Sequence, residues 1–181
     1  METNLTKNPS LLAWLDEKVE LLKPSKIMWI DGSKEQIDAL KKEAVETGEM
    51  IKLNEDLLPD CYLHRTAEND VARVEDRTLI CSREEKDAGP TNHWMEPSKA
   101  YKMLYDIARG SYQGRTMYII PYSMGPVGSP FSKIGVEITD SIYVVLNMNI
   151  MTRIGKKVLD TLGDSNDWVR GMHCKCNVDP E

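Results

Sequence analysis

Phenylalanine is almost absent from this 181-residue chain, which contains Phe131 alone. Ten methionines and seven tyrosines supply part of the large apolar surface that phenylalanine would otherwise provide. The apolar share of 41% and the charged share of 29% are ordinary for a globular protein. A chain of this length corresponds to about one domain and can bury roughly two-thirds of its unfolded surface. A packed core is therefore expected.

Long apolar runs and clusters of basic residues are also missing. No run approaches the ~20 apolar residues that a membrane-spanning helix needs. The net charge is −6, and no group of lysines and arginines is long enough to follow a phosphate backbone. The sequence therefore predicts neither a membrane nor a nucleic acid as a partner.

Cysteine is scarce, with four in the whole chain, which argues against a disulfide scaffold. The first residues, METNLTKNPSLL, lack the basic region and apolar stretch of a secretory signal. A reducing, cytoplasmic setting is expected. The segment HCKC at 173–176 offers three potential metal ligands, but zinc sites usually need two separated pairs, and the other histidines and cysteines are distant in the sequence. Neutral thiols are favoured over a metal site there.

Common catalytic motifs are missing as well. The chain contains no G-x-S-x-G, no H-E-x-x-H and no glycine fingerprint of a dinucleotide-binding fold. Nothing in it forms a self-sufficient active site.

The first 54 residues alternate helical and strand patterns. Asn8-Pro9 predicts the start of a helix that Pro24 ends, and residues 26–30 read as a strand. Ser33 and Gln36 are spaced as a capping box, in which each side chain reaches the other's backbone N–H, and Gly48 ends the helix that follows. Residues 50–54 read as another strand. The segment thus predicts a helix–strand–helix–strand α/β unit.

Residues 55–98 are polar and irregular, with one strand expected at 78–82. A helix is expected at 98–109. Two strand-like runs flank the glycine- and proline-rich segment 125–130, a third and buried strand is expected at 141–150, and a helix at 152–162 ends at Gly163.

The segment 125–130 has two interpretations. Its backbone N–H groups could cradle a phosphate, as glycine-rich loops do. It lacks the GxxxxGK[ST] spacing, however, and its prolines remove donors. A structural corner is favoured.

The segment AENDVARVEDR at 67–77 also has two interpretations. Acidic residues alternate with the arginines here, which is typical of a solvated, self-neutralising loop. Alternatively, one arginine binds an anion, because the planar guanidinium pairs two-to-two with a carboxylate or phosphate. The charged residues are Arg65, which precedes the segment, and within it Glu68, Asp70, Arg73, Glu75, Asp76 and Arg77.

Three long segments together resemble one family in order and without obvious gaps from about Arg65 onward. They are DVARVEDRTLICSREEKDAGPTNHWMEP, GRTMYIIPYSMGPVGSPFSKIGVEITDS and VVLNMNIMTRIGKKVLDTLGD. They are similar to the N-terminal domain of GTP-dependent phosphoenolpyruvate carboxykinase. The resemblance implies an α/β (mixed α+β) fold with a mixed sheet flanked by helices.

The resemblance also implies an activity. Family enzymes, which serve gluconeogenesis or anaplerosis, convert oxaloacetate and GTP to phosphoenolpyruvate, GDP and carbon dioxide, with Mn²⁺ and a second divalent cation that accompanies the nucleotide. The kinase loop, the metal ligands and the guanine pocket lie beyond the point where this chain stops. Residues 1–181 are therefore expected to be the substrate-binding N-terminal domain, truncated and inactive alone, with no metal or cofactor site of its own. The full-length enzyme is expected to be a monomer.

Two residues acquire roles from the VARVE motif. Its arginine, here Arg73, binds the carboxylate of oxaloacetate or phosphoenolpyruvate in the family. The glutamate two residues later, here Glu75, stabilises the ordered form of that loop over the active site. The alternative hypothesis is a stand-alone, non-catalytic module of the same fold that binds a small dicarboxylate or a protein partner.

Overall fold

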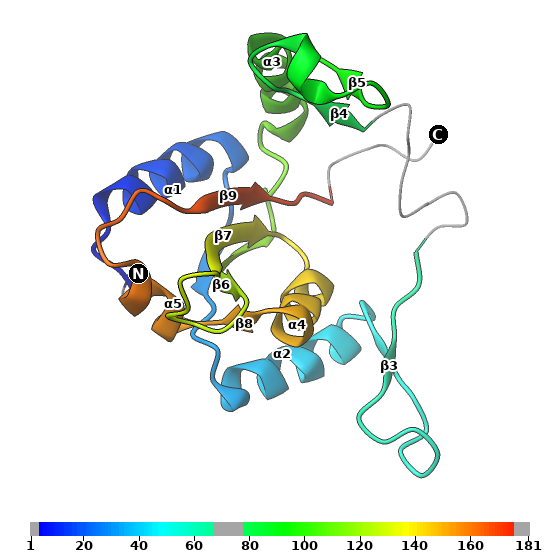
Figure 1. Cartoon of the computed structure of the whole chain (residues 1–181). Helices are drawn as coiled ribbons and strands as arrows, with labels where there is room; N and C mark the ends of the chain where they lie inside the picture. The colour runs from blue at the N-terminus through cyan, green and yellow to red at the C-terminus, as the bar shows by residue number, and fades with distance from the viewer. Residues whose placement is uncertain (1–3, 67–77, 176–181) are drawn as a thin grey trace. The chain divides into compact units, whose positions relative to one another are not determined.

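The computed structural model describes residues 4–66 and 78–175. The chain divides into two compact units, one formed by residues 1–64 with 110–181 and the other by residues 65–109. The larger unit contains a mixed sheet with helices packed against it (Figure 1). The expected α/β class with a mixed sheet flanked by helices is therefore confirmed.

The sheet of the larger unit has the strand order β1-β6-β7-β9, and β8 pairs with β6 beside this path. β6 runs antiparallel to β7 and β8, whereas β1 is parallel to β6 and β9 is parallel to β7. Each of the other three strands thus pairs with one strand of the long central hairpin β6–β7. The strands are β1 (Lys26–Trp29), β6 (Thr116–Met124), β7 (Lys133–Thr139), β8 (Arg153–Ile154) and β9 (Val169–Met172).

Helix α1 (Pro9–Leu22) begins where the sequence predicts. The Asn8 side chain accepts a hydrogen bond from Leu11 N at 3.0 Å, and Pro9 occupies the first turn, where a missing N–H removes no helical bond. Asn8 also donates to the carbonyl of Gly163 at 2.7 Å, so the cap joins the helix to the end of α5 (Lys156–Leu162).

Helix α2 (Lys34–Glu46) has half of the expected capping box. Gln36 N donates to Ser33 Oγ at 3.2 Å. The predicted reciprocal contact, from the Gln36 side chain to Ser33 N, is wrong. The Gln36 side chain instead accepts a hydrogen bond from Asp31 N and donates one to the carbonyl of Trp29. Ser33 N donates to the Asp31 carboxylate at 2.7 Å. The β1–α2 turn therefore satisfies its own backbone through three side chains rather than two.

The core on one face of the sheet lies under α2 and α4 (Ile142–Met151), which pack beside each other (Figure 1). Tyr118 and Ile120 of β6 point into this core, and alternation along the strand sends Met117 and Ile119 to the opposite face. All four side chains are buried, so β6 is covered on both faces. The core residues on the α2/α4 side are Ile30, Ile37, Leu40, Ala44, Met50, Tyr118, Ile120, Ile142, Val145 and Leu146.

The prediction of a buried strand at 141–150 is wrong, because residues 142–151 form helix α4. The run is apolar at almost every position and so carries no period that distinguishes a buried helix from a buried strand. The decisive contact comes from residue 49, whose carboxylate accepts hydrogen bonds from Ser141 Oγ and Tyr143 N at the start of the helix. Such a distant cap is invisible in local sequence.

Two further elements differ from expectation. The strand expected at 50–54 is reduced to β2 (Ile51–Lys52), which pairs with β3 (Tyr62–Leu63) in a separate two-stranded hairpin and does not join the main sheet. The helix expected at 152–162 begins only at Lys156, because residues 153–154 form β8 and pair with β6. Its end at Gly163 is confirmed.

The smaller unit contains more regular structure than its composition suggests. Short strands β4 (Leu79–Ile80) and β5 (His93–Trp94) pair in parallel around a 3₁₀ turn, η2 (Glu85–Ala88). The Trp94 indole donates to the carbonyl of Ser82 at 3.0 Å. Helix α3 (Pro97–Ala108) follows, within one residue of its expected bounds, and the Glu96 carboxylate caps it.

The glycine- and proline-rich segment connects β6 to β7, as the favoured interpretation predicts for a corner. Ser129 N donates to the carbonyl of Pro126, and Ser132 N donates to the carbonyl of Ser129, both at 3.1 Å. Phe131 N donates to Ser129 Oγ at 3.3 Å. These amides satisfy acceptors within the turn, so the segment is built as two consecutive turns of a hairpin.

Candidate functional site

The two site residues that the sequence predicts, Arg73 and Glu75, lie outside the described residues, as does Arg77. Arg65, which precedes that segment, is exposed. The structure does describe the residue that closes the larger unit before this segment, His64. Its surroundings form a network of polar side chains.

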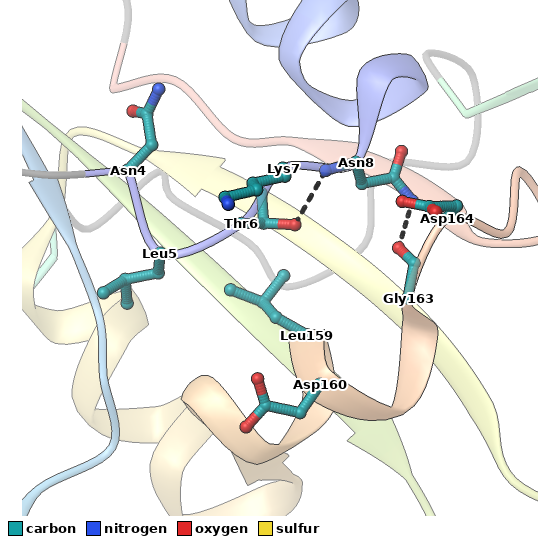
Figure 2. Close-up of a pocket in the computed structure, with 9 residues that line it drawn as sticks. All are labelled: Asn4, Leu5, Thr6, Lys7, Asn8, Leu159, Asp160, Gly163 and Asp164. Atoms are coloured by element: carbon teal, nitrogen blue, oxygen red, sulfur yellow. Dashed lines mark hydrogen bonds between the residues drawn. The ribbon is translucent and has the colours of Figure 1, made fainter.

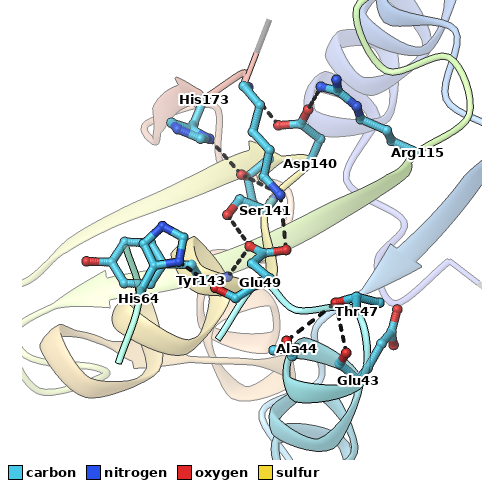
Figure 3. Close-up of polar contacts among 12 residues, drawn as sticks. Glu43, Ala44, Thr47, Glu49, His64, Arg115, Asp140, Ser141, Tyr143 and His173 are labelled. Atoms are coloured by element: carbon cyan, nitrogen blue, oxygen red, sulfur yellow. Dashed lines mark hydrogen bonds and ion pairs between the residues drawn. The ribbon is translucent and has the colours of Figure 1, made fainter. Parts of the chain in front are cut away.

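We call this network the polar junction (Figure 3). It gathers residues from the α2–β2 turn, the end of β3, the start of β6, the β7–α4 turn and the end of β9. Residues distant in the sequence thus meet at the carboxyl ends of β7 and β9, which run parallel. Its members are Glu49, His64, Arg115, Thr139, Asp140, Ser141, Tyr143, His173 and Lys175.

Glu49 is the centre of the polar junction. Its carboxylate accepts hydrogen bonds from Ser141 Oγ at 2.7 Å and Tyr143 N at 2.9 Å, and it pairs with Lys175 Nζ at 3.0 Å. Burial opposes ionisation of this carboxyl, but these three donors outweigh it and hold the pKa of Glu49 below its ordinary value. The ionised side chain also suits the amino terminus of α4, where the helix dipole favours negative charge.

His64 is held by the same turn. Its Nδ1 donates to the carbonyl of Glu49 at 2.7 Å, and its ring stacks on Tyr143 with centroids 4.0 Å apart. His64, the last residue of the larger unit before the segment that contains Arg73, is therefore fixed both by a hydrogen bond and by a stacked ring.

Asp140 ties the end of β9 to the sheet. Its side chain is completely buried, and its carboxylate accepts hydrogen bonds from Arg115 Nη1 at 2.6 Å and from Lys175 N at 2.9 Å.

His173 is held at the end of β9 by two contacts. Its Nδ1 lies 2.9 Å from Thr139 Oγ1, and the Tyr112 hydroxyl donates to the carbonyl of His173. Burial lowers the pKa of His173, which keeps its ring neutral at pH 7.

The polar junction is a positioning network, because its carboxylates already have donors and cations. In the described part of the chain, no three histidine, cysteine or acidic side chains converge in a way that could hold a metal ion. Of the HCKC segment, His173 contacts Thr139, Cys174 is partly buried, and Cys176 lies outside the described residues.

Two surface cavities lie elsewhere on the larger unit. One, of about 370 Å³, separates the amino-terminal segment from α5 (Figure 2), and the other, of about 400 Å³, lies between α2 and the β2–β3 hairpin. In the cavity beside α2, Lys41 pairs with Asp60 at 2.9 Å, and in the cavity beside α5, Asp160 pairs with Lys156 at 2.5 Å. Neither of these two cavities contains a residue that the sequence singled out for chemistry. A third cavity, of about 280 Å³, is lined by residues 128–130 of the glycine- and proline-rich segment together with Lys133 and Trp168.

The sequence missed Glu49, Asp140 and Arg115. The signal that could have found Glu49 is an N-cap at Ser141, but a strand assignment for 141–150 removes the reason to look for one. The salt bridge between Arg115 and Asp140 spans 25 residues and has no local signature.

We expect Glu49→Gln to lower the free energy of unfolding of the chain by about 1–3 kcal/mol at pH 7, because a charge-assisted acceptor is lost. The pKa of Glu49 is lowered by folding, so its contribution is present above pH 4.5 and disappears as the pH falls through the lowered value. The difference between the variant and the parent should therefore shrink below pH 4.5. Denaturant unfolding at several pH values measures this.

Glu46→Gln provides the control for this prediction, because Glu46 makes only a 3.6 Å surface pair with Lys42. It should leave the unfolding midpoint nearly unchanged at every pH. Equal effects of the two variants would show that Glu49 is ordinary surface charge.

Among the helices that the structure describes, none combines the length and apolar character required to cross a membrane.

Comparison with known proteins gives one consistent family. The model of the phosphoenolpyruvate carboxykinase N-terminal domain matches residues 13–181. A protein of Anaeromyxobacter dehalogenans (strain 2CP-C) named phosphoenolpyruvate carboxykinase [GTP] is 51% identical over 176 residues, which cover 97% of this chain and 30% of that protein. A protein of the same name from Corynebacterium jeikeium is 48% identical over 168 residues, 93% of this chain and 28% of that protein.

This chain thus spans about 30% of the length of the curated relatives it matches. The match of the family model covers nearly the whole sequence, and the α/β fold agrees with it. The chain belongs to the phosphoenolpyruvate carboxykinase N-terminal domain family.

Proposed function

We propose that this chain is the substrate-binding amino-terminal domain of a GTP-dependent phosphoenolpyruvate carboxykinase. The observation that carries the proposal is the 51% identity over 97% of the chain to a protein of that name. The full-length enzyme would convert oxaloacetate and GTP to phosphoenolpyruvate, GDP and carbon dioxide.

Within this proposal, Arg73 binds a carboxylate of oxaloacetate or phosphoenolpyruvate. Its guanidinium can form two parallel hydrogen bonds with the carboxylate, which fixes orientation as well as position. Glu75 stabilises the ordered state of the same loop. The polar junction supports the proposal because it holds His64, nine residues before Arg73, at a defined point of the larger unit.

The chemistry of the proposed reaction is mainly positioning and charge stabilisation. Loss of carbon dioxide leaves an enolate, which receives the γ-phosphoryl group of GTP. The carboxylate must be held so that the bond to the departing carbon dioxide aligns with the π system of the forming enolate. A rigidly oriented arginine contributes to this by restricting the bound substrate to reactive geometries.

The described residues do not fit the Mn²⁺ ion that such enzymes use. Glu49 and Asp140 are saturated by hydrogen-bond donors and cations, and His173 is engaged by Thr139. We therefore assign both divalent cations and GTP to the additional length of the full-length protein, and we derive no step through a metal for this chain.

We expect the purified 181-residue chain to fold but to show no conversion of oxaloacetate and GTP with Mn²⁺ present. Folding is expected because caps, apolar periods and the packed core agree over most of the sequence. Circular dichroism and a coupled assay for GDP check the two halves of this prediction. Turnover by the chain alone would contradict the assignment of the catalytic groups to the rest of the protein.

The proposal itself is tested in a full-length protein that contains this domain. Carboxykinase activity with GTP is the expected result. A folded full-length protein that binds oxaloacetate without turnover would instead favour the non-catalytic module.

A further inference from the structure

Glu137 stands near the middle of β7 as a half-buried carboxyl group. No hydrogen bond or ion pair reaches it from any residue that the structure describes. Burial raises its pKa to about 7, and no other cause contributes. A carboxyl group in such a place is destabilising when it ionises, unless a donor or cation meets it.

Glycine residues of β7 and β9 lie beneath the side chains of Glu137 and Tyr122. Glu137 pairs in register with Gly171 of β9, and a Cβ atom added to Gly171 would lie 1.8 Å from Glu137 Oε2. The next pair toward the amino terminus of β7 is Gly135, where an added Cβ would lie 2.5 Å from the Tyr122 hydroxyl oxygen. Both polar groups therefore lie flat over glycine backbone. We call this surface the glycine strip: Gly135 and Gly171 with Tyr122 and Glu137 above them.

Lys133, two residues before Gly135 on β7, shares the face of the glycine strip, but it is exposed and no ion pair joins it to Glu137 in the described part of the chain. Helix α4, which packs on the same side of β6, contains no charged residue. On β9, Arg170 is in register with Val136 and belongs to the opposite face, where it stacks on Trp168 at 4.2 Å. His173 shares the face of Glu137, but burial lowers its pKa and keeps it neutral.

The Tyr122 hydroxyl is the remaining ionisable group of the glycine strip. Its pKa is raised first by burial and second by the charge of Glu137, so it stays neutral at physiological pH. Tyr122 thus offers hydrogen bonds but no countercharge. The face presents a carboxyl group and a hydroxyl above glycine backbone, edged by Val169, which is 52% exposed.

We propose that the glycine strip is a docking surface for the additional part of the full-length carboxykinase, and that Glu137 pairs there with a guanidinium or ammonium group of that part. This inference rests on the proposed function. Because Glu137 and Tyr122 lie flat over the two glycines, the sheet presents a low surface that another chain can approach closely, and a positive group there would stabilise the ionised form of Glu137. The relatives supply the occupant, because this chain covers only about 30% of their length.

The test is the sign of the stability change on Glu137→Gln. In the 181-residue chain, folding raises the pKa of Glu137 to about 7, so ionisation destabilises the fold increasingly between pH 4.5 and pH 7. Glutamine removes that penalty. We expect the variant chain to melt about 2–4 °C above the parent at pH 8 and close to it at pH 5. In the full-length protein, the same substitution should lower Tm at pH 8, because it leaves the docked cation unpaired.

Asp16→Asn is the matched control, since Asp16 is exposed and its loss removes the same charge. It should leave Tm unchanged in both proteins. An increase in Tm for Glu137→Gln in the full-length protein would overturn the proposal. A concentration-dependent decrease in the 181-residue chain would overturn it too, by identifying a second copy as the occupant.

These outcomes are separate from the proposed function, which the activity of the unmodified full-length protein tests. A second variant, Gly171→Ala, places a methyl group where the carboxylate lies and should displace it into solvent. It should reproduce the loss of stability in the full-length protein while retaining Glu137. No loss in that variant would show that the glycine strip is not covered.

Discussion

Arg73→Lys in a full-length carboxykinase is expected to lower kcat/KM for oxaloacetate ten- to several-hundred-fold. Lysine keeps the positive charge but lacks the planar fork, so it can hold a carboxylate without setting its orientation. A charge-assisted bidentate pair contributes about 2–3 kcal/mol, part of which survives as a single contact. Each 1.4 kcal/mol corresponds to about a factor of ten in rate. Steady-state kinetics with varied oxaloacetate measures the loss.

Two comparisons make this prediction specific. The KM for GTP should barely change, because the nucleotide is assigned to the part of the protein beyond this chain. Arg77→Lys, which changes an arginine four residues away in the same charged segment, should be nearly silent. Small and equal effects of the two substitutions would show that Arg73 has no special role, and the family assignment of the VARVE motif would not apply here.

Gly155→Ala is expected to destabilise the larger unit by about 3–5 kcal/mol. Gly155 precedes α5 with φ +109° and ψ −167°, a conformation that is essentially restricted to glycine. An added Cβ would lie 2.2 Å from the carbonyl oxygen of Asp31 and 2.9 Å from Gly32 Cα. Both are backbone atoms of the β1–α2 turn, so no side chain can rotate away. Backbone strain and steric conflict therefore add, and a loss of this size is a large fraction of the stability of a typical domain.

Hydrogen bonds keep Gly155 close to the β1–α2 turn, so the two backbones cannot move apart freely to make room for an added Cβ. Lys156 N donates to the carbonyl of Asp31 at 3.1 Å, and Gly155 N donates to the carbonyl of Pro121 at 2.9 Å. Separating the two backbones would break the first of these bonds. Gly48→Ala is the control, because Gly48 also has a positive φ, +77°, but an added Cβ meets no atom within 4 Å. We expect it to cost about 1 kcal/mol. Denaturant unfolding of both variants separates steric conflict from backbone strain. Equal losses in the free energy of unfolding would show that the backbone around Gly155 moves aside at little cost.

Helix ends with local signals were predictable. Asn8-Pro9, Ser33 and Gly163 mark helix ends through groups within four residues of the backbone they satisfy, and the structure confirms each of them. The β6–β7 hairpin was equally readable, because two β-rich runs enclose a segment whose glycines and prolines suit a turn. These features depend on short-range hydrogen bonds and steric preferences, which the sequence contains in full.

The family was also readable from the sequence, because it depends on the order of residues and not on their contacts. The comparisons confirm it over residues 13–181. The roles of Arg73 and Glu75 remain predictions, since both residues lie outside the described part of the chain.

The remaining features were decided by contacts between distant residues. Residues 142–151 form a helix because Glu49 caps them and the α2 core receives them, whereas their own uniform apolarity permits a strand equally well. Residues 153–154 are drawn into the sheet by pairing with β6. Glu137 acquires its raised pKa from the strands packed around it, since a glutamate in isolation carries no sign of burial. By itself the sequence determined the caps at Asn8 and Ser33, the turn between β6 and β7 and the family, because their causes are local or lie in residue order. Only the tertiary structure decided the identity of α4, the polar junction and the environment of Glu137, because burial and long-range hydrogen bonds exist only once the chain has folded.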